Sequence, residues 1–136
     1  YYLSDKNWKP KKSKKFMGNY NDLLVYKKAF GLAMKIFMVS KSFPAEEKFT
    51  LSNQIRRSSR SVCANIAESY TRRKFRNYFL SKLNDVECEN AETQVWLDFA
   101  FNCSYITPAK YQELTSENNE IGKLTWFMIH NAEKFL

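Results

Sequence analysis

The sequence predicts an all-α protein whose four helices pack as an antiparallel up-down-up-down bundle. Its 136 residues, the length of one domain, include only three glycines and three prolines. The turn residues that a β-sandwich or a βαβ fold needs are therefore scarce. Four long segments repeat apolar residues at alternating three- and four-residue spacings, the period of a helix that buries one face. Short connections between these segments favour antiparallel neighbours.

The first predicted helix spans about residues 21–42. Phe43 and Pro44 end it, because the residue before a proline is pushed away from the α region. Residues 45–49 then form a connector with a helical turn, and Thr50 is a suitable N-cap for the next helix. The apolar stripe of the first helix comprises Leu23, Tyr26, Phe30, Ala33 and Phe37, with Leu24 and Ile36 beside it.

The second predicted helix spans residues 51–69, a turn follows at 70–73, and the third helix spans 74–102. Leu51, Ile55, Val62 and Ile66 form the stripe of the second helix, with Ser58 and Asn65 in line with them. The third helix repeats a position every seven residues, as a bundle helix does. This stripe contains Phe79, Leu83, Val86, Asn90, Thr93, Leu97 and Ala100.

The fourth predicted helix begins with a strong start signal, the N-cap Thr107 followed by Pro108 at the first helical position. Its stripe contains Tyr111, Leu114, Asn118, Ile121, Thr125, Met128, Ala132 and Phe135. Polar residues thus fall inside several stripes, and an unpaired buried amide costs about 1–3 kcal/mol. We therefore expect Asn65 and Asn90 to belong to one hydrogen-bonded polar layer that fixes helix register.

Aromatic and apolar residues near the end of the third helix and along the fourth exceed what one bundle face needs. Such an excess favours a second buried face and hence self-association, and a wide core stripe is the alternative. The residues concerned are Val95, Trp96, Phe99, Trp126 and Phe127.

Charge divides the chain into an N-terminal extension and the bundle domain. Residues 1–16 hold six lysines and one aspartate and show no apolar period, so we expect a disordered or loosely docked basic arm. Met17 is a plausible native start, and residues 17–136 form the four-helix bundle domain. The formal net charge of +8 lies mostly in the extension, because the remaining chain has a net charge of only +3.

Within the predicted bundle the charge is polarised. Residues 54–76 carry seven basic residues and one acid, whereas residues 85–98 carry five acids and no base. This division has two interpretations. Either the basic face binds phosphates, or basic and acidic faces meet within or between subunits, with Glu68, Glu89 and Glu92 as the partners. Phe75 is expected in the core, which would leave Tyr70 and Tyr78 available for stacking on bases.

No catalytic, cofactor-binding or metal-binding pattern stands out, so we expect a protein that is not an enzyme and that holds no cofactor or metal. His130 is the one histidine, no glycine-rich phosphate loop occurs, and the three cysteines are widely spaced. We interpret Cys63, Cys88 and Cys103 as small buried residues kept reduced. With no membrane-spanning stretch or signal peptide in the sequence, we expect a soluble cytoplasmic protein.

Four motifs resemble the four-helix-bundle proteins encoded in bacterial 23S rRNA intervening sequences. They are the FP-x-E-x-x-x-x-L-x-x-QIRRSS run at residues 43–59, ANIAE at 64–68, ETQVWLDFA at 92–100 and the Tyr105-Ile106 pair. The resemblance spans about residues 20–136. More distantly, the chain is similar to the accessory protein of diversity-generating retroelements.

This resemblance implies a bundle that assembles as a ring-like homopentamer and binds structured RNA or DNA. In the retroelement relatives the basic ring surface contacts nucleic acid and a reverse transcriptase. The resemblance assigns the nucleic-acid contacts to two sets of residues. Arg56, Arg57 and Arg60 match the basic positions of the motif, and Arg72, Arg73, Lys74 and Arg76 fall in the corner between the second and third helices.

Two functional hypotheses follow. The first is a non-enzymatic, oligomeric nucleic-acid-binding bundle, with RNA the more favoured ligand, that reads shape and backbone rather than sequence. The second is a protein-interaction scaffold or accessory subunit, for example for a reverse transcriptase. The direction of the arginines discriminates between them, because an open basic face favours binding and a face buried by acids favours scaffolding.

Overall fold

The computed structural model describes residues 18–136, so the basic extension at residues 1–16 lies outside the described residues. Four long helices form the described part: α1 (Leu24–Ser40), α2 (Leu51–Thr71), α3 (Arg76–Asn102) and α4 (Pro108–His130). Three short 3-10 turns accompany them: η2 (Tyr20–Asp22), η3 (Ala45–Glu47) and η4 (Ala132–Lys134). The all-α prediction is confirmed, and the ends of the first three predicted helices agree with the observed ones to within three residues. α4 begins at Pro108 as predicted but ends at His130, before Ala132 and Phe135, the last two residues of its predicted stripe.

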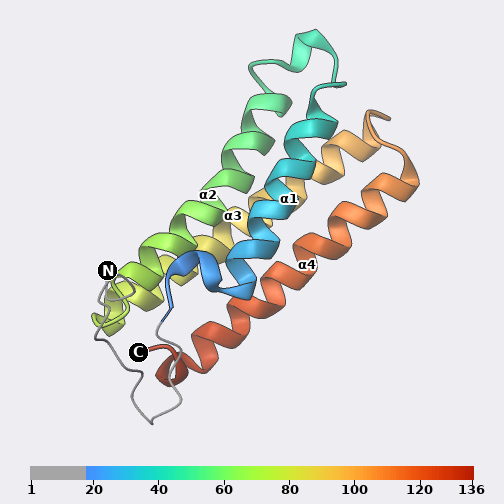
Figure 1. Cartoon of the computed structure of the whole chain (residues 1–136). Coiled ribbons are helices and arrows are strands. Elements are labelled where there is room, and N and C mark those ends of the chain that lie inside the picture. The colour runs from blue at the N-terminus through green and yellow to red at the C-terminus, as the bar shows by residue number, and fades with distance from the viewer. Residues whose placement is uncertain (1–17) are drawn as a thin grey trace.

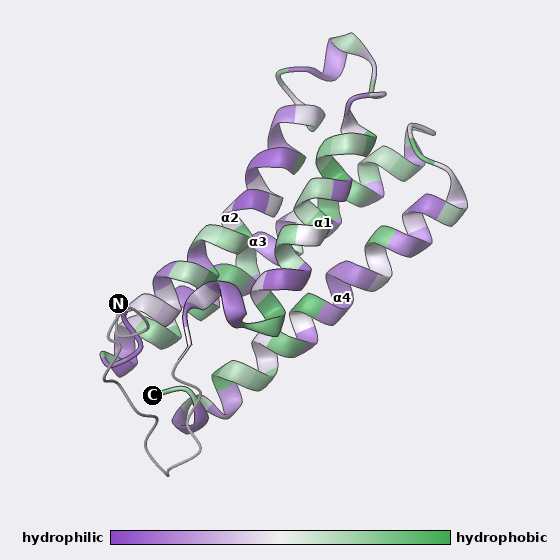
Figure 2. Ribbon diagram, viewed as in Figure 1, coloured by the Kyte–Doolittle hydropathy of each residue, from purple (hydrophilic) through white to green (hydrophobic). Residues whose placement is uncertain are grey.

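The four helices pack as an antiparallel bundle in which each helix contacts its two neighbours (Figure 1). α1 packs against α2 and α4, and α3 packs against the same two helices. The α1–α2 and α3–α4 connections lie at one end of the bundle. The α2–α3 corner and the end of α4 lie at the other. Apolar residues line the helices where they face one another, and the first turns of α2 are mostly hydrophilic (Figure 2).

The apolar stripes of α2, α3 and α4 form the core as predicted, whereas the stripe of α1 is shifted. Phe30 and Leu24 were expected in the core, but both side chains are exposed. The buried apolar residues of α1 are Val25, Ala29, Leu32, Ala33 and Ile36. α1 carries apolar side chains around much of its circumference, so more than one stripe satisfies the three-four spacing.

The buried polar layer exists, but the predicted role of Asn65 is wrong. Asn90 donates from Nδ2 to Oδ1 of Asn118 at 2.7 Å, and Asn118 donates back to the carbonyl oxygen of Asn90 at 3.1 Å. Asn65 instead donates to the carbonyl oxygen of Ser61 within its own helix. These reciprocal amide bonds join α3 to α4 and fix the register of the two helices.

The end of α3 is closed by a residue with a positive φ that is not glycine. Ser104 has a φ of 62°, and the amide of Tyr105 donates to the carbonyl oxygen of Ala100 at 2.9 Å. The amide of Ser104 donates to the carbonyl oxygen of Phe101, which completes a Schellman motif. Tyr105 is thereby turned back toward the α1–α2 connector.

The cysteines differ from the expectation that all three are buried, because Cys88 and Cys103 are exposed and only Cys63 is buried. Burial raises the pKa of the Cys63 thiol to about 11. Since the thiolate is the reactive form, we expect a disulfide reagent at pH 8 to modify two thiols rapidly and Cys63 roughly 100-fold more slowly. A double variant with Cys88→Ser and Cys103→Ser should retain only the slow phase. Three equal rates would contradict the burial of Cys63.

Candidate functional site

The basic residues of the 54–76 stretch form two surfaces rather than one. The first, which we call the α2 groove, is a shallow open depression along the start of α2. Its walls include Lys48, Phe49, Asn53, Arg56, Arg57 and Arg60. The second, which we call the corner, comprises Arg72, Arg73, Lys74 and Arg76 between α2 and α3. About 18 Å of helix separates Arg60 from Arg72, so one small ligand cannot contact both surfaces.

Arg56 is held in place by two contacts across the α1–α2 interface. Its Nε donates to Oγ of Ser40 at 2.7 Å, and its guanidinium carbon lies 5.0 Å from the centroid of the Phe37 ring. Arg60 stacks near the same ring at 5.5 Å. Neither guanidinium pairs with a carboxylate of residues 18–136. Their terminal amino groups therefore remain for an external acceptor.

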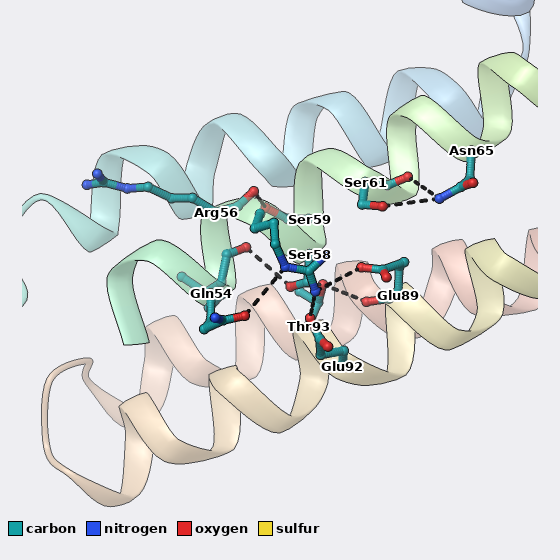
Figure 3. Close-up of polar contacts among 11 residues, drawn as sticks. Gln54, Arg56, Ser58, Ser59, Ser61, Asn65, Glu89, Glu92 and Thr93 are labelled. Carbon is teal, nitrogen blue, oxygen red and sulfur yellow. Dashed lines mark hydrogen bonds and ion pairs between the residues drawn. The ribbon is translucent and has the colours of Figure 1, made fainter. Parts of the chain in front are cut away.

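Arg57 is oriented differently, toward α3. It forms ion pairs with Glu92 and with Glu89, the latter at 3.4 Å, and its Nε donates to the side chain of Gln54. Figure 3 shows Glu89 and Glu92 facing α2, and it shows the side chain of Arg56 extending away from them. The predicted pairing of an arginine with these acids therefore occurs within one chain and concerns Arg57. Glu68 pairs with Lys82 at 3.0 Å rather than with an arginine.

The corner contains two cations that no carboxylate of the described chain neutralises. The guanidinium of Arg72 lies 5.2 Å from the ring centroid of Phe75 and 5.8 Å from that of Tyr78, and the ammonium of Lys74 lies 5.2 Å from Phe75. Both basic side chains are exposed. Cation–π contacts of this kind hold the basic groups without cancelling their charge.

The other two basic residues of the corner are engaged with the bundle. Arg73 is half-buried, donates to the carbonyl oxygen of Tyr70 at 2.8 Å and stacks 4.0 Å from the Tyr70 ring centroid. Arg76 forms an ion pair with Glu133, beyond the end of α4. Both members of that pair are largely exposed, so the pair adds little stability.

The expected roles of the corner aromatics are reversed. Phe75 was placed in the core, but 49% of it is exposed. Tyr70 was thought available for stacking, but it is fully buried. Tyr78 is partly exposed, as expected. Phe75 and Tyr78 are therefore the aromatic surfaces that accompany the corner cations.

A network around Glu47 positions the α2 groove. The carboxylate of Glu47 accepts from the hydroxyls of Thr50 and Tyr105, the latter at 2.9 Å, which ties the α1–α2 connector to the α3–α4 loop. These bonds lower the pKa of Glu47, and the bond to Glu47 raises the pKa of Tyr105 to about 12. Thr50 is the N-cap residue of α2, as predicted, but its hydroxyl donates to Glu47 instead of capping the helix. Lys48 and Phe49 lie between Glu47 and Thr50, so these bonds fix the two ends of the segment that carries them.

Sequence reasoning missed Phe49, Lys48 and Asn53 as parts of the groove. A signal for Phe49 exists in the sequence. An apolar residue just before an N-cap often packs against an apolar side chain at the fourth residue of the helix. In this chain Phe49 precedes the N-cap Thr50, but the fourth residue of α2 is the polar Gln54. Phe49 therefore has no apolar partner of this kind, and 81% of it is exposed.

No catalytic constellation is evident in residues 18–136. No group of three or more histidine, cysteine, aspartate or glutamate side chains in this part of the chain is placed to hold a metal ion. The ring of His130 stacks on Trp126 with centroids 4.0 Å apart. None of the described helices is both long enough and apolar enough to cross a membrane.

Residues 18–136 thus form a four-helix bundle with basic patches, in which no catalytic centre is evident. Residues 21–126 match the 23S rRNA-intervening sequence protein family, and the chain belongs to this family. Among solved structures, the chain is similar to a protein of unknown function from the S23 ribosomal protein family of Bacteroides thetaiotaomicron. The two share 34% sequence identity and a TM-score of 0.73, over 82% of this chain and 98% of the other. Comparison with curated proteins gives no match.

Proposed function

We propose that this protein is a non-enzymatic nucleic-acid-binding bundle that contacts the backbone of structured RNA through the α2 groove and the corner. One observation carries the proposal. Five cations of the α2 groove and the corner have no carboxylate partner among residues 18–136. They are Lys48, Arg56, Arg60, Arg72 and Lys74. Arginine suits this role because its planar fork binds phosphate oxygens in pairs, and each neutralised phosphate releases counterions.

The contrast with the α1–α4 face supports the proposal. On that face Lys28 pairs with Glu120, and Lys35 pairs with Glu113 and Glu117. Acids of α4 thus neutralise these two lysines of α1, whereas most basic residues of the α2 groove and the corner have no acidic partner among residues 18–136. The description of the family names 23S rRNA intervening sequences, so RNA is the first nucleic acid to test.

Self-association is part of the proposal. Exposed apolar side chains lie on α1, α3 and α4, and a second copy of the chain could bury them. They include Phe30, Met34, Val95, Phe99, Trp126 and Phe127. A ring-like homopentamer, which the family resemblance implies, would repeat the basic surfaces around one axis and so multiply weak phosphate contacts.

The same apolar residues favour a second candidate function, a scaffold or accessory subunit for a protein such as a reverse transcriptase. In that case the exposed apolar residues contact the partner protein, and the cations serve to orient it. The two candidates differ in one respect that can be measured, because only the first requires direct affinity for nucleic acid.

Binding to structured RNA and to duplex DNA across a salt series tests the proposal. Both the full chain and a chain that begins at Met17 should be used, with the mass determined by light scattering in the same samples. We expect both chains to bind RNA with an affinity that falls steeply as salt rises. If the shorter chain binds no nucleic acid at low salt, the basic extension was responsible, and the scaffold function is favoured.

A further inference from the structure

The geometry points to an unpaired nucleotide as the ligand of the α2 groove, with its base stacked on Phe49 and its phosphates bound by Arg56, Arg60 and Lys48. This inference rests on the proposed function and adds the class of ligand. The groove would take a single-stranded segment, such as a loop or bulge of a structured RNA, rather than a continuous duplex.

Phe49 supplies the stacking surface. It is the most exposed large apolar side chain of residues 18–136, with 81% of it open to solvent, and it lies on the wall of a groove whose charged members are all basic. Stacking of a base on an aromatic ring contributes about 1–3 kcal/mol and tolerates any base. Bases inside a duplex are already stacked on one another, so an exposed ring at this place selects unpaired ones.

Arg56, Arg60 and Lys48 supply the phosphate contacts. The bond from Arg56 to Ser40 and the stacking of Arg56 and Arg60 on Phe37 hold both guanidinium groups before a ligand arrives. A preorganised side chain loses less conformational entropy on binding than a free one. The ammonium of Lys48 lies 5.4 Å from the Phe49 ring centroid. The stacking surface and one cation are thus adjacent, as base and phosphate are within one nucleotide.

A polar group for the base edge is also available. Asn53 is exposed and lines the same groove. Its amide both donates and accepts, so it can pair with the polar edge of a base once that base has left its partner. Arg57 is less available, because Glu89 and Glu92 hold it on the α3 side.

A subunit contact is the competing explanation for Phe49. On its other side Phe49 borders an apolar depression that also includes Trp96, Phe99 and Cys103. If a second copy covered this depression, Phe49 would be buried in the oligomer. A test must therefore record mass as well as affinity.

The experiment measures the affinity of the full chain for labelled RNA of roughly 12 nucleotides, within the range of known single-strand sites, as a single strand and as a duplex of the same sequence. The variants are Phe49→Leu, which keeps an apolar side chain but removes the ring, and Phe49→Trp, which keeps a ring. Phe99→Leu is the matched control, because Phe99 is exposed and borders the depression but not the groove. The affinity for single-stranded DNA of the same sequence shows whether the protein distinguishes ribose from deoxyribose.

We expect Phe49→Leu to weaken single-strand binding by about 5- to 100-fold and to leave duplex affinity and mass unchanged. Phe49→Trp should bind single strands at least as well as the wild type, and Phe99→Leu should not alter their affinity. If the wild type binds RNA but Phe49→Leu has no effect, or weakens single strand and duplex equally, the inference fails and the proposed function stands. A lower mass for Phe49→Leu would identify Phe49 as a subunit contact. If the wild type binds no nucleic acid, both proposals fail.

Discussion

Replacing Arg72, Arg73, Lys74 and Arg76 together with alanine is expected to weaken the binding of structured RNA by about 100- to 1,000-fold near 0.1 M salt. The slope of log affinity against log salt should also fall by about 2 to 4, because each lost phosphate contact removes slightly less than one unit. The bundle should remain folded, since three of the four side chains are exposed and no core residue changes. Circular dichroism and light scattering on the same samples check this point.

The matched control for the corner variant removes four lysines from α1 and α4, Lys27, Lys35, Lys110 and Lys123. It lowers the net charge of the chain by the same four units without altering the corner or the α2 groove. We expect it to lose little affinity, because two of these lysines already pair with acids of α4. An equal loss of affinity in both variants would mean that total charge, rather than the corner, governs binding.

Replacing Phe79 with alanine is expected to lower the free energy of unfolding by about 3–5 kcal/mol. Phe79 is fully buried near the start of α3, and its ring stacks on that of Phe135 with centroids 6.3 Å apart. Phe75→Ala, four residues earlier, removes the same ring from a half-exposed site and should cost only about 1 kcal/mol, the value of its cation–π contacts. Urea denaturation at one protein concentration compares the two variants, since self-association makes stability depend on concentration.

This pair of variants also tests where the aromatic residues of the corner lie. If Phe75→Ala costs as much as Phe79→Ala, then Phe75 is buried in the solution state and a neighbouring copy covers the corner. The corner would then be a subunit contact. If the two values differ as expected, Phe75 and Tyr78 remain accessible beside Arg72.

Much of the fold could be predicted because local signals mark the helices. Thr107 and Pro108 mark the start of α4, and the Thr107 side chain accepts a hydrogen bond from the backbone amide of Lys110, as an N-cap does. The seven-residue repeat of α3, from Phe79 through Val86 and Thr93, lies in the core throughout. Spacing is informative in these helices because polar residues separate the apolar ones and leave a single stripe.

The hydrogen-bond partners of polar residues in these stripes could not be predicted in the same way. Asn65 and Asn90 both have positions inside an apolar stripe, yet Asn90 meets Asn118 whereas Asn65 bonds to its own helix. Helical periodicity assigns a residue to a face, but the axial offset between two helices decides which residue it meets. In the same way, α1 is apolar on more than one side, so its spacing could not exclude Phe30 from the core.

In the candidate site too, the sequence predicted which residues are present but not which neighbours their side chains contact. All seven predicted basic residues lie on α2, in the α2–α3 connection or at the start of α3. However, adjacent arginines point to different neighbours. Arg56 reaches Ser40 on α1, while Arg57 reaches Glu92 on α3. Phe49 lies in a connector, where periodicity carries no information, and only its missing apolar partner in α2 marks it.

The most direct test of the central claim is ultraviolet cross-linking of the full chain to structured RNA, followed by mass spectrometry of the cross-linked peptides. Since aromatic side chains in contact with bases cross-link readily, we expect the adducts in peptides that contain Phe49 and in those that contain Phe75 and Tyr78. Peptides from the α1–α4 face, with Lys28 and Lys35, should carry none. Adducts confined to residues 1–16, or spread over the α1–α4 face, would contradict the claim that the α2 groove and the corner bind RNA.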